Sequence, residues 1–202
     1  MNELCIGRRA GYESLPMRAW VALFAVLALA GCGSGDGAAG ANGTDAAFVV
    51  DMSEHHLGAI EMARIAQDRA TKPEIRALAE DIIGSQESEI ARMKSIGRQL
   101  PEPPEGGMGI SHAEMGMGMD TRLLEYVRPF DRVFIDMMIP HHEGALVMAK
   151  RVIADGEQPE LRRMARGMIA AQAREIAQMR RWRKQWYGVD EIGEPDQSHS
   201  HH

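Results

Sequence analysis

One stretch of the 202-residue chain occurs twice, and this repeat constrains the fold more than any other feature of the sequence. Each copy contains a His-His pair, His55-His56 in the first and His141-His142 in the second, so the copies lie 86 residues apart (141 − 55). A methionine stands three residues before the first histidine of each pair, and another stands seven residues after it. The same offset continues downstream in three further pairs: Gln86 and Gln172, Glu89 and Glu175, and Met93 and Met179. Because an internal repeat sets the architecture of a chain, we expect one helical hairpin to be used twice.

Apolar residues recur at helical spacing around each His-His pair. His55 and His141 lie centrally within the apolar stripes of their helices, and His56 and His142 lie on the flanks. The other members of the first stripe are Phe48, Met52, Ala59, Met62, Ala63 and Ala66. The spacing predicts four helices: about 46–68, about 73–99, a third starting near 128, and about 159–187. Thr44 or Asp45 is expected to cap the first, and Pro73 suits the start of the second. The prediction is an all-α four-helix bundle built from two repeated hairpins, residues 46–100 and 128–187.

The third predicted helix contains Pro140, which is expected to kink it just before the second His-His pair. The segment between the hairpins, residues 101–127, is rich in proline and glycine and is expected to form an irregular crossover. This crossover also carries five soft or borderline metal ligands: Met108, His112, Met115, Met117 and Met119.

The first 32 residues have the composition of a targeting segment. Three arginines precede an apolar run from Trp20 to Ala30 that is too short to cross a bilayer comfortably. The run ends in Leu29-Ala30-Gly31-Cys32, which resembles the lipobox of bacterial lipoproteins and predicts lipidation of Cys32. The alternative is that the apolar run forms a buried or membrane helix. The true start of the chain is either Met1 or Met17. We expect residues 33–45 to form a flexible tether and residues 188–202 to form a disordered tail whose histidines bind metal weakly or not at all.

Composition excludes several kinds of function. A net charge of −6 without a basic stripe argues against a nucleic-acid partner. Cys5 would leave with the leader and Cys32 would carry the lipid, so the mature domain would have neither a disulfide nor a thiolate metal site. No glycine-rich phosphate loop and no Ser/His/Asp arrangement can be assigned, and no organic cofactor is expected.

The combination of thioether and imidazole ligands favours copper, and Cu(I) in particular. The candidate ligands on the first and third helices are Met52, His55, His56, Met62, Met138, His141, His142 and Met148, to which the crossover adds its five. The side chains expected to orient the imidazoles are Gln86, Glu89, Gln172 and Glu175, which interrupt the apolar faces of the other two helices. Two alternatives remain. Methionines at helical spacing are often ordinary core residues, and the histidines, the central His55 and His141 in particular, could be core groups bonded to the two glutamates. The crossover methionines could equally form a hydrophobic lid.

The second copy, from Phe134 to Ala149, resembles the hallmark of the DUF305 family, as does the segment from Ala170 to Met179. The likeness covers about residues 46–187. It implies a ferritin-like four-helix bundle that is secreted or lipid-anchored, and some members of the family are implicated in copper binding and copper tolerance. The first copy departs from the pattern because Ser53 and Glu54 stand where the second has Ile139 and Pro140.

The sequence therefore predicts an extracytoplasmic, lipid-anchored protein that binds copper for storage, buffering or tolerance and passes it to another envelope protein. Two other classes stay open. One is a redox metal oxidase with His55, His141, Glu89 and Glu175 as ligands, although Gln86-x-x-Glu89 lacks the histidine of a di-iron site. The other is an envelope interaction module in which the motifs are a polar core network. The sequence leaves the oligomeric state open.

Overall fold

The computed structural model describes residues 41–188. Four α-helices make up almost all of this part of the chain, together with one short 3-10 helix in the crossover, and the described residues contain no strand. The elements are α1 (Gly43–Arg69), α2 (Pro73–Gly97), η1 (Thr121–Glu125), α3 (Phe130–Asp155) and α4 (Pro159–Tyr187). The predicted all-α four-helix bundle is confirmed. The sequence did not predict η1.

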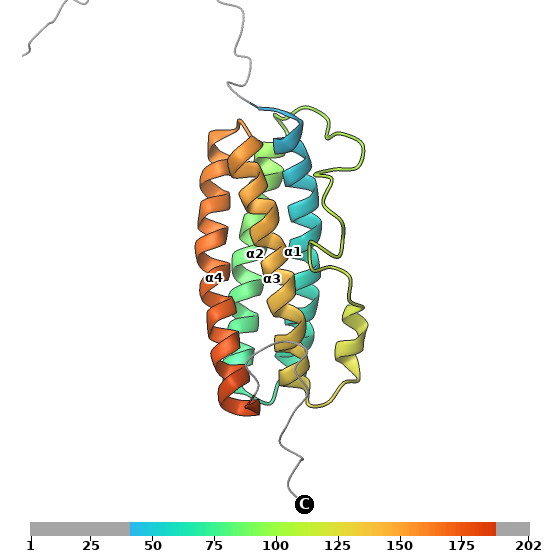
Figure 1. Cartoon of the computed structure of the whole chain (residues 1–202), viewed down its shortest axis with the longest axis vertical. Coiled ribbons are helices and arrows are strands. Elements are labelled where there is room, and N and C mark those ends of the chain that lie inside the picture. The colour runs from blue at the N-terminus through green and yellow to red at the C-terminus, as the bar shows by residue number, and fades with distance from the viewer. Residues whose placement is uncertain (1–40, 189–202) are drawn as a thin grey trace, which may run out of the picture. The chain divides into compact units, whose positions relative to one another are not determined.

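The helices form two antiparallel hairpins, α1 with α2 and α3 with α4 (Figure 1). The crossover between them runs back along the outside of the bundle, from the end at which α2 finishes to the end at which α3 begins (Figure 1). As a result α1 and α3 pack against each other in opposite directions, and η1 lies against α1. This topology brings the two repeated His-His motifs onto neighbouring helices.

The observed helix ends differ from the predicted ones by a few residues. Helix α1 begins at Gly43, three residues early, because the side chain of Asn42 caps it in a reciprocal capping box with Asp45. Pro159 opens α4 as Pro73 opens α2, each at a position where no intrahelical N–H is needed. Helix α3 continues through Pro140 without interruption.

Each hairpin has one buried aspartate that accepts hydrogen bonds from the turn of the other hairpin. Asp45, at the start of α1, accepts hydrogen bonds from the backbone N–H groups of Glu157 and Gln158 in the turn between α3 and α4. Asp131, at the start of α3, accepts from the backbone of Thr71 and Lys72 in the turn between α1 and α2, and also from the Thr71 hydroxyl. Donors and acceptors of one set lie 86 residues from those of the other, so the repeat is an approximate two-fold symmetry of the bundle.

The apolar core consists of two clusters at opposite ends of the bundle. One contains Phe134 and Met138 of α3 with the second half of α1, and the other contains Phe48 and Met52 of α1 with the second half of α3. The central positions of all four helices between these clusters are occupied by the histidines, glutamines and glutamates of the repeat. The bundle is therefore divided across its middle by a polar layer.

No helix within residues 41–188 combines the length and the apolar character needed to cross a membrane. The predicted leader with its lipobox Cys32, most of the predicted tether, and the histidine-containing tail from 189 onward lie outside the described residues.

Candidate metal centre

Four histidines form the centre of the polar layer, which we call the histidine layer: His55 and His56 of α1, and His141 and His142 of α3. All four are buried, with at most 3% of any residue exposed. Gln86 and Gln172, the glutamines from α2 and α4, are buried as well. A cluster of four imidazoles in a helical core is costly unless their ring nitrogens have partners.

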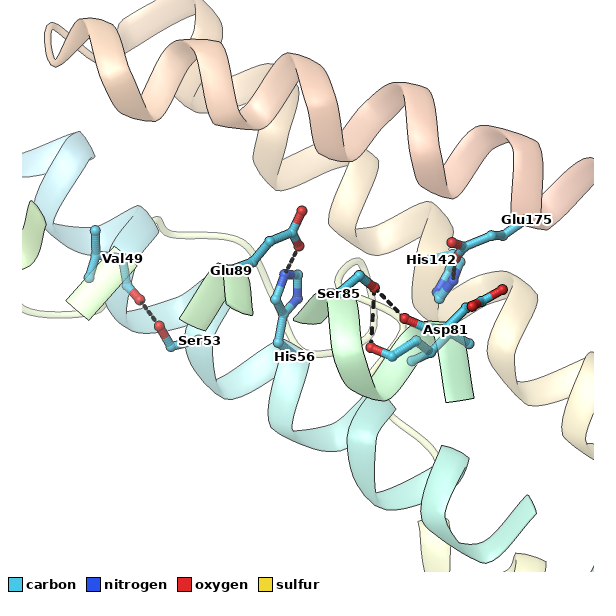
Figure 2. Close-up of polar contacts among 9 residues, drawn as sticks. Val49, Ser53, His56, Asp81, Ser85, Glu89, His142 and Glu175 are labelled. Atoms are coloured by element: carbon cyan, nitrogen blue, oxygen red, sulfur yellow. Dashed lines mark hydrogen bonds and ion pairs between the residues drawn. The ribbon is translucent and has the colours of Figure 1, made fainter. Parts of the chain in front are cut away.

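The flanking histidine of each pair, His56 or His142, is hydrogen-bonded to a glutamate of its own hairpin. His56 Nε2 donates to Glu89 at 2.8 Å, and His142 Nε2 donates to Glu175 at 2.6 Å (Figure 2). Sequence reasoning considered these glutamates as partners of the central histidines His55 and His141, and the structure gives them to the flanking pair instead. The reason is geometric, since successive residues on a helix point about 100° apart. Within each pair, therefore, one ring turns toward the hairpin partner and the other toward the opposite hairpin.

The central histidines, His55 and His141, contact each other across the interface between α1 and α3. The ring centroids of His55 and His141 are 3.8 Å apart. His55 Nε2 also donates to the backbone carbonyl of Met115 at 2.9 Å, which ties the crossover to the histidine layer. His141 has no hydrogen-bond partner within the described part of the chain at either ring nitrogen.

These hydrogen bonds determine where the imidazole lone pairs lie. His55, His56 and His142 each donate from Nε2 to an oxygen, so in the neutral ring the lone pair is on Nδ1. All three Nδ1 atoms are buried and lack a partner among residues 41–188, as do both nitrogens of His141. Gln86 and Gln172 likewise keep a buried carbonyl oxygen without a donor in this part of the chain. Histidines that ligate metals usually show this pattern, with one nitrogen held by an oxygen and the other left to coordinate.

Burial also keeps the central rings in the form that coordinates metal. Desolvation, reinforced by the neighbouring His56, lowers the pKa of His55 to about 3. The pKa of His141 is lowered well below its usual value, again mainly by burial and then by the other three histidines of the layer. Both rings are therefore neutral at pH 7, and a metal would not have to displace a proton from either of them.

The methionines of the repeat lie on both sides of the histidine layer. Met62 and Met138 belong to one apolar cluster, Met52 and Met148 to the other, and all four are at most 2% exposed. The crossover residues predicted to capture metal differ in their burial. Met108 and Met115 are buried in the core, Met117 is half-buried, Met119 is 41% exposed, and His112 is exposed.

Sequence reasoning missed part of the surroundings of the layer. A cavity of about 170 Å³ adjoins His141, and its lining includes Met62 together with Met117, Met119, Met137 and Gly58. Met137 could have been found, since it directly precedes a candidate ligand. The Met115 carbonyl could not, because no side-chain pattern signals which backbone atom a loop will present. Within residues 41–188, no group of three or more His, Cys, Asp or Glu side chains is arranged as a ready-made metal site.

Several solved structures are similar to this chain in fold and sequence. The structure of CopM in its Cu(II)-bound form aligns with a TM-score of 0.63 and 40% identity, over 71% of this chain and 97% of that one. The Cu(I)-bound form of CopM aligns at 0.61 with 36% identity, over 71% and 98%. A DUF305 protein from Streptomyces coelicolor aligns at 0.63 with 30% identity, over 70% and 93%. A search of curated proteins returns no match.

The family model described as "Domain of unknown function (DUF305)" matches residues 45–183, which include all four helices nearly in full. The match contains both His-His pairs and both glutamates that bind them. It agrees with the resemblance carried by the sequence motifs and with the solved structures. The chain belongs to the DUF305 family.

Proposed function

We propose that this protein binds copper, as Cu(I), in the histidine layer at the centre of the bundle. The observation that carries the proposal is a set of buried ring nitrogens that have no partner within residues 41–188: Nδ1 of His55, His56 and His142, and both nitrogens of His141. A folded core seldom leaves so many adjacent polar atoms unsatisfied without a functional reason. The likeness to CopM, whose structures include Cu(I)-, Cu(II)- and silver-bound forms, supports copper as the metal.

The surrounding side chains suit a soft cation. Imidazole nitrogen and thioether sulfur both bind Cu(I) well, whereas magnesium and calcium require oxygen ligands. Glu89 and Glu175 accept hydrogen bonds from the far sides of two imidazoles, which fixes their orientation and makes their ligating nitrogens more basic. Buried methionines lie in the apolar clusters on both sides of the layer, and their thioethers would be the soft ligands to complete the coordination of a metal held there. The mechanism would be ligand exchange without turnover, which fits storage, buffering or tolerance.

The same proposal places the protein outside the cytoplasm. The DUF305 protein from Streptomyces coelicolor is described as secreted, which supports an extracytoplasmic location. We add that Cys32 carries a lipid anchor, as the Leu29-Ala30-Gly31-Cys32 motif indicates. A lipid-anchored copper store would pass its metal to another protein of the cell envelope.

A competition titration tests this function. The full chain and two variants, His141→Phe and His112→Phe, would compete for Cu(I) with a chromogenic chelator under anaerobic conditions. Because His141 is buried in the layer and His112 is exposed, the first variant should lose the tight site and the second should keep it. Equal affinity of all three proteins would show that the copper is bound elsewhere.

A further inference from the structure

The repeat contains a pair of equivalent glycines, and the crossover packs more closely against one of them than against the other. Gly58 and Gly144 each lie three residues after the first histidine of their pair. A Cβ atom at Gly144 would overlap the backbone of Met115, so the crossover covers that side of the histidine layer closely. Apart from its own helix backbone, a Cβ atom at Gly58 would meet one heavy atom of the described chain within 4 Å, His141 Nε2, at 3.3 Å. The two halves of the layer are thus not equally covered.

The Gly58 side, which the crossover covers less closely, opens into the cavity of about 170 Å³ that Gly58 and His141 both line. Four methionines also line it: Met62 from α1, Met137 from α3, and Met117 and Met119 from the crossover. Their exposure decreases inward, from 41% at Met119 through the half-buried Met117 to 4% at Met137 and 2% at Met62. Thioethers therefore extend from the surface to an imidazole whose nitrogens have no partner in the described chain.

This arrangement matches what a soft monovalent cation would need to reach a buried site. A bare Cu(I) ion cannot cross an apolar wall without ligands, because desolvation of an ion costs far more than a core can recover. Thioethers replace those ligands without adding charge, and they exchange Cu(I) or Ag(I) while offering little to Zn(II) or Mg(II). Glu61, also in the lining and exposed, adds negative charge that attracts a cation.

We propose that this cavity, the methionine port, binds Cu(I) first and delivers it to His141, and that the Gly144 side of the layer is closed to metal. The inference rests on the proposed function of the histidine layer and adds a direction to it: metal enters and leaves beside α1. Gly58 stays small because any side chain there would stand between the port and His141 Nε2.

The test compares the rates of copper uptake and release in two glycine variants. Gly58→Leu places a side chain inside the port, and Gly84→Leu makes the same change in α2, where a Cβ atom would have no neighbour within 4 Å. Cu(I) uptake from a chelator, followed by stopped-flow absorbance, should slow about tenfold or more in Gly58→Leu alone, within the range over which association rates vary among mutants. Release to a stronger chelator should slow by a similar factor, since blocking a path leaves the bound state nearly unchanged.

A second variant needs no change of shape and covers the case in which Gly58→Leu fails to fold. Met117→Leu with Met119→Leu keeps the apolar lining but removes the two outer sulfurs, so uptake of Cu(I) and Ag(I) should slow while circular dichroism and the melting temperature stay unchanged. If wild-type protein takes up no copper at equilibrium, the proposed function itself is wrong. If wild type fills and both port variants fill at the same rate, the histidine layer stands and the port is refuted.

Discussion

The two histidines of one pair, His141 and His142, should respond in opposite ways to the same substitution in the metal-free protein. They are neighbours on α3 and both are buried. His141 has no hydrogen-bond partner among residues 41–188 at either nitrogen, whereas His142 holds Glu175. His141→Phe therefore removes two unsatisfied polar atoms. His142→Phe removes one and also breaks a charge-assisted hydrogen bond.

The expected difference follows from these contacts. An unsatisfied buried polar group costs about 1–3 kcal/mol, and a hydrogen bond to a charged group contributes about 1.5–3 kcal/mol. The Glu175 side chain is 21% exposed, so water recovers part of the loss and the lower end of each range applies. Both variants add similar bulk, and the cavity beside His141 gives that ring more room. His141→Phe should be more stable than His142→Phe by at least about 2.5 kcal/mol, or roughly 5–10 °C in melting temperature for a domain of this size.

Urea denaturation of the two variants and the wild type, monitored by circular dichroism without metal, measures this difference. Wild type should fall between the two variants. Equal stability of the variants, or a more stable His142→Phe, would show that the assignment of hydrogen bonds within the histidine layer is wrong.

Two further predictions rest on the structure and a third on the sequence. The pKa of His55 falls from 6.5 to about 3 on folding, and that of His141 falls as well, so below pH 6.5 the unfolded chain takes up protons that the folded protein does not. The metal-free protein should therefore lose stability as the pH falls from 6.5 toward 3, by about 1.4 kcal/mol per pH unit for each histidine, and His141→Phe should show a shallower slope in urea titrations. Asp131→Ala and Asp45→Ala should each destabilise the bundle by about 2 kcal/mol or more, because each aspartate is buried and accepts from two backbone N–H groups of the opposite turn. Thermal melts would check this, with exposed Asp81→Ala as the control that should change little, and a comparable shift in all three would argue against the aspartate fastenings. Cys32→Ser should move the protein out of the membrane fraction or leave an unprocessed precursor on immunoblots, and a mature, membrane-bound variant would refute lipidation at that residue.

Helix positions could be predicted from the sequence because each depends on local information. Apolar spacing located all four helices, and Pro73 and Pro159 marked two starts to the residue. The start of α1 was misplaced because Asn42 caps it, while Thr44 and Asp45, within three positions of it, offered competing caps. The aspartate fastenings were visible in principle, since Asp45 and Asp131 obey the 86-residue offset.

The candidate site was only partly predictable, because its details depend on how the hairpins meet. The repeat identified all four histidines, but a helical wheel ranks a residue by its own helix and cannot say which neighbouring helix faces it. His56 and His142 were therefore placed on the flanks, although both are buried against a glutamate of the partner helix. The crossover was expected to be an irregular segment. Its docking on His55 through a backbone carbonyl depends on three-dimensional proximity alone.

X-ray absorption at the copper edge would test the central claim most directly. The Cu(I)-loaded full chain would be measured beside a variant in which His55 and His141 are both replaced by Phe. In both proteins His199, His201 and His202 would be changed to Ala, so that the tail contributes no imidazole. The account predicts imidazole scattering in the first protein and its loss or marked reduction in the second. Imidazole scattering of equal strength in both proteins, or thioether scattering alone in the first, would contradict a copper site in the histidine layer.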